Sequence, residues 1–259
     1  MLVPLCMTCQ QTPKPQAPVN KTASNGVLNL SFGPSTSNPA GKAAAERLLQ
    51  AMGGTAKVDA VKTLRQNVLA VQQSGQRVDI EQTIVYPDKQ LQRLKAPDGS
   101  MLLVVTPTDA FLMKGGQVRD LPSAQRASLD ATLKHDFINI LQHVNDPKYI
   151  FAATGHEPVG GIDATVVDVE ADGVPTTWWI GSDGKLLQER YSDMGPTGEM
   201  QTMAYSEWKD FGGLQYPTKY EMFNAAGEPQ LSMTLTSMQV NAPIEPRIFQ
   251  RPVFNRETD

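Results

Sequence analysis

The side chains best suited to metal or acid–base chemistry are the three histidines, His135, His143 and His156. His135 and His143 are eight residues apart, whereas a spacing of four places two ligands on one helix face, and no HExxH motif or inverted equivalent occurs. We therefore predict no metal site and expect solvated or hydrogen-bonded histidines. The sequence also contains no Gly-x-Ser-x-Gly, Walker or dinucleotide-binding motif, so we predict no catalytic residue and no cofactor.

Four carboxylates, Glu170, Asp172, Glu189 and Glu207, could in principle pair for general acid–base catalysis. Their sequence neighbours are polar, which is typical of the solvent-facing side of a strand. We expect these carboxylates to be solvated. A hydrolase with an unrecognised site is therefore the third of three hypotheses, because the usual triads and metal-ligand spacings are missing.

The two cysteines, Cys6 and Cys9, lie in the first ten residues. A Cys-x-x-Cys pair without further ligands or a βαβ context is a weak signal for metal or redox chemistry. Residues 1–7 are apolar but shorter than a signal-peptide core, and residues 14–38 are rich in Pro, Ser, Thr and Asn. We interpret residues 1–37 as the remnant of an export signal followed by a flexible linker, with Cys6 or Cys9 as candidates for lipid attachment.

Composition limits the partners. The net charge of −4 and the even mix of signs provide no basic patch, so we expect no nucleic-acid partner. No apolar run approaches the ~20 residues that cross a bilayer. Of the 259 residues, we assign 38–252 to a single mainly β domain and 253–259 to a C-terminal tail, and we expect a monomer.

The remaining candidate chemistry is apolar binding. Methionines and large aromatic residues recur along the predicted strands: Met101, Met113, Met200, Met203, Met222, Met233, Met238, Trp178, Trp179, Tyr205, Trp208, Tyr220 and Phe223. Met side chains are flexible and polarisable, so a face lined with them accepts irregular apolar ligands. The alternative is that these residues fill a poorly regular core.

The elements that must position these residues are mostly strands. Turn signals such as Asp-Gly separate segments rich in β-branched and aromatic residues. The predicted strands are residues 64–73, 76–86, 89–96, 100–106, 110–114, 117–120, 150–154, 166–170, 176–180, 185–191, 200–210, 215–223 and 230–240. We expect about ten of them to form one antiparallel sheet. Side chains alternate along a strand, so Trp178 and Ile180 should share one face while Trp179 lies on the other.

Three helical segments interrupt the strands. Asn38 and Pro39 form a helix start, and Gly53 and Gly54 end that helix. A short helical turn is predicted at residues 56–61. A second longer helix is predicted from Pro122 to about residue 135, and a third, strongly amphipathic helix is predicted to follow a cap at residue 136. The fold class is therefore α+β and mainly β. A long antiparallel sheet must curl, close or be covered, which predicts a strongly curved sheet or incomplete antiparallel β-barrel covered by two or three helices.

Particular motifs in this order resemble those of a known family. Trp178 begins WWIGSDGKLLQERYSD, a strand, an Asp-Gly turn and a second strand; Gly198 begins GEMQTMAYSEWKDFGGLQYP, the next hairpin; and IFQRP closes the domain with a Phe-x-x-Pro pattern. Over roughly residues 38–252 the chain resembles the periplasmic lipoprotein carriers typified by LolA and LolB. The resemblance implies an incomplete antiparallel β-barrel covered by helices, with an apolar cavity for acyl chains.

The leading hypothesis is a non-enzymatic periplasmic carrier that holds a lipid, a lipoprotein acyl chain or another apolar ligand, with a lipoprotein or membrane protein as its partner. Strand alternation and the resemblance predict the cavity-lining residues Phe111, Met113, Phe137, Leu141, Trp178, Ile180, Met203, Tyr220, Met222, Met233 and Leu235. The second hypothesis is a structural or protein-interaction module of the same fold whose core is filled by its own side chains.

Overall fold

The computed structural model describes residues 36–192 and 199–252. They form one antiparallel sheet of 13 strands, more than the predicted ten because every predicted segment joins the same sheet. The strands are β1 (Thr63–Gln72), β2 (Arg77–Val85), β3 (Lys89–Ala96), β4 (Gly99–Val105), β5 (Ala110–Lys114), β6 (Gln117–Asp120), β7 (Tyr149–Val159), β8 (Ile162–Ala171), β9 (Val174–Gly181), β10 (Leu186–Ser192), β11 (Met200–Phe211), β12 (Leu214–Phe223) and β13 (Pro229–Val240). Cys6, Cys9 and the predicted tail 253–259 lie outside the described residues.

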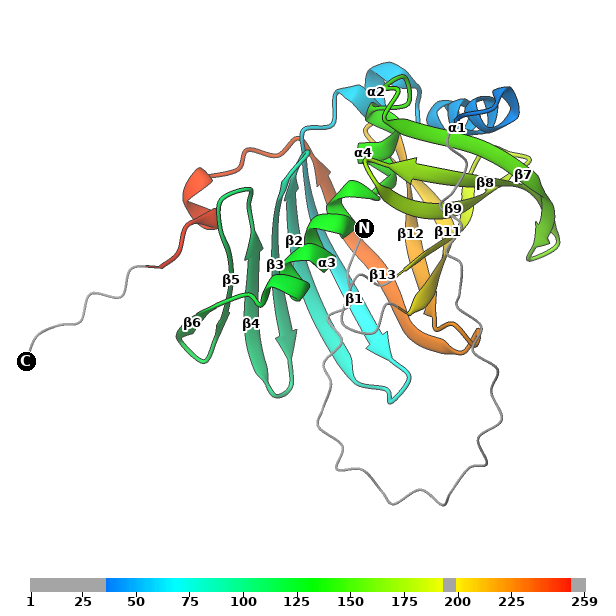
Figure 1. The fold of residues 1–259 in the computed structure, drawn as a ribbon. Coiled ribbons are helices and arrows are strands. Elements are labelled where there is room, and N and C mark those ends of the chain that lie inside the picture. Colours follow the sequence, from blue (N-terminus) through cyan, green and yellow to red (C-terminus); the bar gives the residue numbers. More distant parts are fainter. Residues whose placement is uncertain (1–35, 193–198, 253–259) are drawn as a thin grey trace, which may run out of the picture.

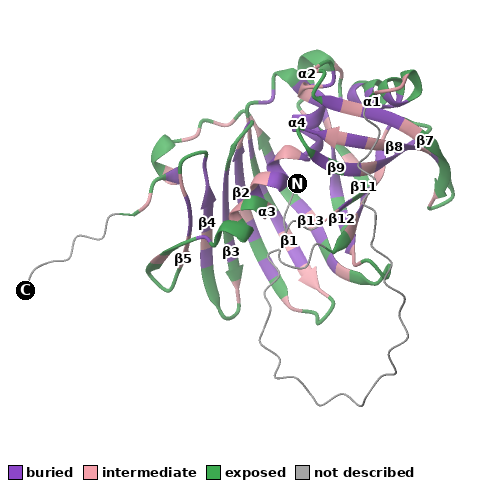
Figure 2. Cartoon of the chain, in the orientation of Figure 1, coloured by how far each residue is buried: buried purple, intermediate pink, exposed green. Residues whose placement is uncertain are grey.

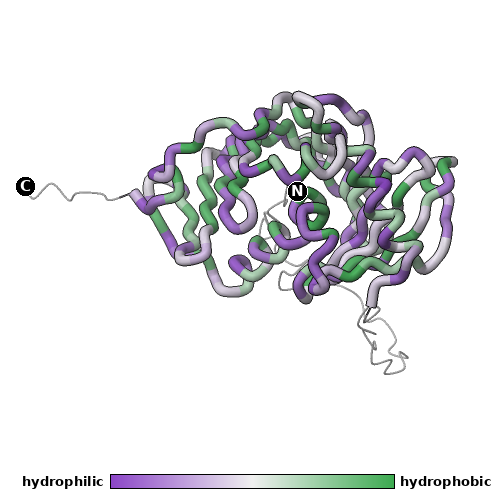
Figure 3. The backbone as a smooth tube through the Cα atoms, turned by 90° about the horizontal axis from the view of Figure 1, so that it is seen from above, coloured by the Kyte–Doolittle hydropathy of each residue, from purple (hydrophilic) through white to green (hydrophobic). Residues whose placement is uncertain are grey.

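The sheet has two arms that meet at one seam. Strand β1 pairs with β13, so that the order across the sheet is β6-β5-β4-β3-β2-β1-β13-β12-β11-β10-β9-β8-β7. Strands β6 and β7 are the two edges, and the sheet curves without closing (Figures 1 and 3). The prediction of a strongly curved, incompletely closed antiparallel sheet with few helices is confirmed.

The helices occupy the hollow side of this sheet (Figure 1). They are α1 (Pro39–Ala51), α2 (Thr55–Asp59), α3 (Ser123–Lys134) and α4 (Phe137–Gln142), whereas the short 3-10 helix η1 (Pro246–Phe249) lies against the outer face of the β3–β5 region. Helices α3 and α4 form the connection between the edge strands β6 and β7. None of the described helices is long and apolar enough to cross a membrane.

Helix α1 begins where the sequence predicts. The Asn38 side chain accepts a hydrogen bond from the Gly41 amide at 2.7 Å, and Pro39 supplies the first helical residue, whose missing N–H needs no partner. The same amide side chain ties the helix to β7, because Oδ1 accepts from the Ala153 N–H and Nδ2 donates to the Ala153 carbonyl. The buried stripe that contains Ala44 and Leu48 then covers the β7–β9 end of the hollow face.

The two faces of the sheet bury different clusters. Buried residues alternate with exposed ones along many of the strands (Figure 2). The main core lies on the concave face and joins α1, α2, α4 and most strands, a smaller cluster that contains Leu129 lies on the same face, and the clusters that contain Phe111 and Trp179 lie on the convex face. Trp178 and Ile180 belong to the concave core, and Trp179 packs with Ala164 and Val166 on the opposite face. The predicted alternation along β9 is confirmed.

Candidate functional site

Nine of the eleven predicted cavity-lining residues lie in the concave core: Phe137, Leu141, Trp178, Ile180, Met203, Tyr220, Met222, Met233 and Leu235. Phe137 and Leu141 come from α4, and the others come from the β9–β13 side of the sheet. The structure thus brings together residues that are almost a hundred positions apart in sequence. That this face holds a ligand stays a prediction.

Phe111 and Met113 lie elsewhere. Phe111 packs with Leu91, Val104 and Phe249 in a separate cluster beneath η1, on the convex face. Met113 is half-buried and shares the face of Phe111, because it lies two residues further along β5. Both faces of β5 are apolar, so sequence alternation alone could not show which side faces the helices.

Aromatic side chains fill the part of the concave face beneath α4 in this conformation. The ring of Phe137 from α4 lies 5.2 Å from the ring of Tyr216 and 5.8 Å from that of Tyr205, and Tyr205 lies 5.7 Å from Tyr220. All four rings are buried. An apolar ligand could therefore reach these rings only if α4 moved.

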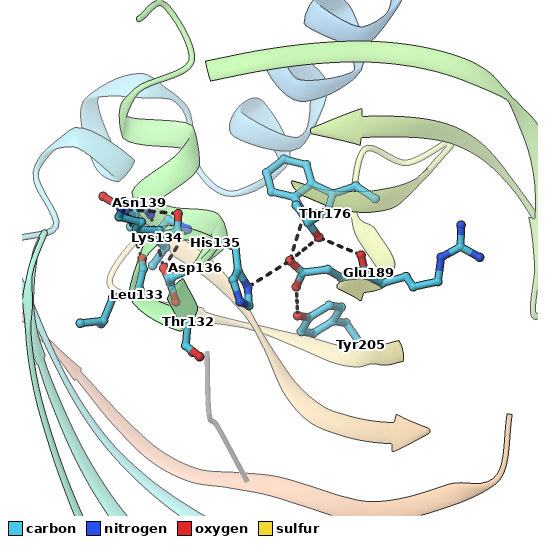
Figure 4. Close-up of polar contacts among 12 residues, drawn as sticks. Thr132, Leu133, Lys134, His135, Asp136, Asn139, Thr176, Glu189 and Tyr205 are labelled. Carbon is cyan, nitrogen blue, oxygen red and sulfur yellow. Dashed lines mark hydrogen bonds and ion pairs between the residues drawn. The ribbon is translucent and has the colours of Figure 1, made fainter. Parts of the chain in front are cut away.

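A buried carboxylate lies beside this aromatic group. Glu189 of β10 is 0% exposed, and its carboxylate accepts hydrogen bonds from Thr176 Oγ1 at 3.0 Å, Trp178 Nε1 at 3.3 Å and Tyr205 OH at 2.7 Å (Figure 4). Three donors from three residues offset much of the desolvation cost of a buried carboxylate. The expectation that Glu189 is solvated was wrong.

The position of Glu189 along its strand was the best available indication that its side chain is buried. It lies two residues before Tyr191, hence on the same face, and opposite Trp178 in the neighbouring strand. A charged residue that shares a face with buried aromatic residues needs internal partners. Polar neighbours at positions 188 and 190 lie on the other face and therefore say nothing about the side chain of Glu189.

His135 links Glu189 to the helical segment. This residue is 2% exposed at the junction of α3 and α4, and its Nδ1 lies 3.7 Å from Glu189 Oε1 (Figure 4). That distance is too long for a hydrogen bond but suits an ion pair when the imidazole is protonated. The His135 ring also lies 4.7 Å from the ring of Tyr191. The ring contact with Tyr191 therefore holds the junction against the sheet.

Asp136 makes the second attachment at this junction. Its Oδ1 caps α4 by accepting from the Ile138 amide at 3.0 Å and the Asn139 amide at 3.3 Å, as the sequence predicts for this helix start. The same oxygen accepts a hydrogen bond from Tyr86 OH at 2.9 Å. Asp136 thus fixes both the start of α4 and its position against the end of β2.

Burial and nearby carboxylates control the ionisation of two tyrosines at this site. Burial raises the pKa of Tyr205 well above its ordinary value, and the negative charge of Glu189 raises it further. Burial and then Asp136 raise the pKa of Tyr86 in the same way. Both phenols therefore remain protonated at neutral pH and act as hydrogen-bond donors to the carboxylates.

Helix α3 is fastened near its two ends. Arg126 Nη2 donates to the carbonyl oxygens of Thr106 at 3.2 Å and Pro107 at 2.8 Å, in the turn between β4 and β5. Lys134 Nζ lies 3.0 Å from the carboxylate of Asp172, in the turn between β8 and β9. The helix therefore spans from one arm of the sheet to the other.

A pocket of about 930 Å³ is separate from this face. It lies between the ends of the first strands and residues 241–251, and it is lined by residues such as Lys62, Lys89 and Phe249. No residue of α3 or α4 and none of the eleven predicted residues lines it. Within residues 36–192 and 199–252, no group of three or more His, Cys, Asp or Glu side chains is placed to hold a metal ion.

Comparison of the sequence with protein-family models and with curated proteins gives no match. Comparison of the structure does. A domain from Vibrio parahaemolyticus described as an outer membrane lipoprotein-sorting protein domain is 12% identical, with 81% of this chain and 96% of that chain covered and a TM-score of 0.52. A DUF1329 family protein from Desulfovibrio piger is 12% identical, with 81% and 97% covered and a TM-score of 0.53.

A LolA superfamily protein from Nitrosomonas europaea gives the same result. It is 12% identical, with 80% of this chain and 97% of that chain covered, and the TM-score is 0.50. At this level of identity the likeness concerns the fold. The resemblance to LolA-like proteins is confirmed at that level, over most of the chain.

Proposed function

We propose that the protein is a non-enzymatic carrier or binding protein of the periplasm, which holds a lipid, a lipoprotein acyl chain or another apolar ligand against the concave face of the sheet. The observation that carries the proposal is the way in which α3 and α4 cover the concave face. Helices α3 and α4 lie over a large apolar face, and polar contacts at Arg126, Lys134 and Asp136 fasten them to the sheet. The fold likeness to a lipoprotein-sorting domain supports the same function.

The proposed mechanism is displacement followed by burial. Movement of α3 and α4 would expose the concave face, and an acyl chain would replace the contacts that Phe137 and Leu141 make with the strands. Each buried methylene contributes about 0.8 kcal/mol, so a dozen methylenes offset the entropic cost of association. The nine predicted residues of the concave core are the proposed contacts. Phe111 and Met113 belong to the convex face and are not part of this site.

A test of the cover uses the ion pair between Lys134 and Asp172. Lys134→Met removes this contact, and we expect a fluorescent fatty acid to associate faster with the variant, because the covered state is less favoured. Stopped-flow fluorescence measures the rate. Lys185→Met is a matched control, since Lys185 pairs with Asp183 at 3.2 Å at a similar exposure but lies in a hairpin away from α3. Equal rates for both variants and the wild type would contradict the proposed opening.

The presence of a ligand is tested on purified protein. Native mass spectrometry should show bound lipid or acylated species after purification without detergent, and extraction followed by lipid analysis should identify them. The proposal fails if the protein carries no such species and also binds no fatty acid when one is added.

The second candidate is a protein-interaction module with a filled core. One observation favours it: four aromatic rings on the concave side, those of Phe137, Tyr205, Tyr216 and Tyr220, already pack against one another. In that case added fatty acids should not bind, and amide hydrogen exchange in α3 and α4 should be as slow as in the central strands.

A further inference from the structure

A row of glutamines crosses the concave face beneath α3. Gln66 in β1, Gln82 in β2 and Gln92 in β3 are directly opposite one another in the strand register. Gln90 lies two residues before Gln92 and therefore on the same face. All four side chains are at most 3% exposed. Glutamine is rarely buried to this extent, so the burial of four glutamines on one face requires an explanation.

Within the described part of the chain, two of these glutamines have no hydrogen-bond partner for their side chains. Both the amide nitrogen and the amide oxygen of Gln90 are buried without a partner there, and the same is true of Gln92. A buried polar group that makes no hydrogen bond destabilises the fold, and apolar residues of the same shape would avoid that cost. Gln66 is different, because its Nε2 donates to Met238 Sδ at 3.4 Å.

The two glutamines lie between apolar surfaces. Gln90 is opposite Ile84 of the main concave core and Val105 of a second concave cluster. Helix α3 crosses the boundary between these clusters, since its Leu129 belongs to the second cluster and Leu133, one turn later, belongs to the first. Displacement of α3 would therefore uncover two amide groups in the middle of an apolar face.

We propose that Gln90 and Gln92 bind the amide linkage of an N-acylated ligand whose hydrocarbon chain lies along the concave face. This inference rests on the proposed function. A glutamine amide offers both donors and an acceptor, and residues two apart on a strand lie about 7 Å apart. A secondary amide presents its N–H and its carbonyl on opposite sides, so one glutamine can accept from the N–H while the other donates to the carbonyl. An ester has no N–H, so its carbonyl can accept from one glutamine but the amide oxygen of the other glutamine receives no hydrogen bond.

The test compares two dodecanoyl probes that differ in this linkage, N-methyldodecanamide and methyl dodecanoate. Both are titrated against the full chain by displacement of anilinonaphthalene sulfonate. We expect the amide to bind about tenfold more tightly than the ester, the effect of one additional net hydrogen bond. In the double variant Gln90→Met/Gln92→Met this preference should disappear, while the ester still binds.

Thermal unfolding supplies a readout that does not depend on ligand. The double variant should have the same or a higher Tm than the wild type, because it removes four buried polar atoms that lack partners among the described residues. Gln66→Met is the matched control. It is in the same row and equally buried but has a partner, so its Tm should fall.

The outcomes separate the two proposals. If the wild type binds neither probe, the carrier function fails and the inference fails with it. If the wild type binds both probes equally, or if the double variant keeps the preference for the amide, only the inference is overturned. A fall in the Tm of the double variant as large as that of Gln66→Met also overturns it, because the amides would then be satisfied in the free protein.

Discussion

Glu189 shows how a single charged residue can be kept inside an apolar core. Its carboxylate receives donors from a threonine, a tryptophan and a tyrosine, and His135 approaches it from the helical segment. The net stability from such a buried group is small, because desolvation cancels most of the attraction. Removing the carboxylate alone is costly, because it leaves its donors buried and without an acceptor.

Substitution of Glu189 tests this arrangement. Glu189→Leu should lower the free energy of unfolding by roughly 3–5 kcal/mol, the usual cost of breaking a buried charged network, and Glu189→Gln should cost less because it retains an acceptor. Urea denaturation measures both. Glu81→Leu is the control: Glu81 pairs with Lys95 on the exposed surface, so its loss should cost less than about 1 kcal/mol. Similar losses in the free energy of unfolding at both positions would contradict the conclusion that the carboxylate of Glu189 holds a buried network together.

The buried tyrosines predict how stability responds to alkaline pH. Burial is the main cause that raises the pKa values of Tyr86, Tyr205, Tyr216 and Tyr220. The folded state therefore favours the neutral phenols. Their contribution to stability is fully present below the unfolded-state pKa of about 10 and is lost as the pH rises from there toward the raised folded-state values.

We expect these four phenols to ionise together with unfolding. Tyrosinate absorbance and far-ultraviolet circular dichroism, followed over the same alkaline titration, should change in one common step for these residues. Ionisation of all six tyrosines while the circular dichroism stays native would contradict the prediction.

At the scale of elements, local signals in the sequence were sufficient for most of the fold. The Asn38 cap, the Asp136 cap and the Asp-Gly turn at Asp172 and Gly173, where both residues have positive φ, are decided by neighbours in sequence. The face of Phe111 and the burial of Gln92 are decided by strands and helices far along the chain. No local pattern encodes which side of a two-sided apolar strand receives a helix.

The contact between α1 and β7 depends on a residue with no side chain. A Cβ at Gly41 would lie 2.4 Å from the Phe151 carbonyl oxygen, so α1 would have to move away from the strand. Gly41→Ala should therefore destabilise the protein by roughly 1–3 kcal/mol, in spite of the better helix propensity of alanine. Thermal unfolding measures the change.

Gly155 in β7 is the control for this substitution. A Cβ at Gly155 would have no atom of the described residues within 4 Å, and its φ is not positive, so Gly155→Ala should be neutral or slightly stabilising. If Gly41→Ala were equally well tolerated, α1 could shift on the sheet without cost and the close contact would not determine its position.

At the scale of the whole molecule, the end of the described chain returns to the outer face of strands β3–β5. Arg251 forms hydrogen bonds with both carboxylate oxygens of Asp109 at 2.8 Å, pairs with Asp120, and lies over the ring of Phe111. Phe249 fills the convex cluster beside it. These contacts bury Phe111 and explain why it does not face the helices.

Acidification should release this segment. The Arg251 guanidinium lowers the pKa of Asp109 below its ordinary value. A lowered folded-state pKa gives stability that is present above the unfolded-state value of about 3.9 and is lost as the pH falls through the folded-state value. Hydrogen exchange in residues 246–252 should therefore become faster, relative to the central strands, only below about pH 4. Arg251→Met should show the faster exchange at neutral pH as well. Identical exchange in the wild type and the variant at neutral pH would contradict the role of Arg251 in holding residues 246–252 against the sheet.

The seam between β1 and β13 has a consequence for how the chain acquires this structure. Contacts across it, such as that of Asn67 with Ser237, join residues 170 positions apart, so the two arms cannot be connected until nearly the whole domain has been synthesised. A topology dominated by such long-range pairings folds slowly, since a large loop must close before the pairing stabilises it. Until then β1 presents an unpaired edge to other chains, and during that interval a nascent chain of this protein has most need of a chaperone.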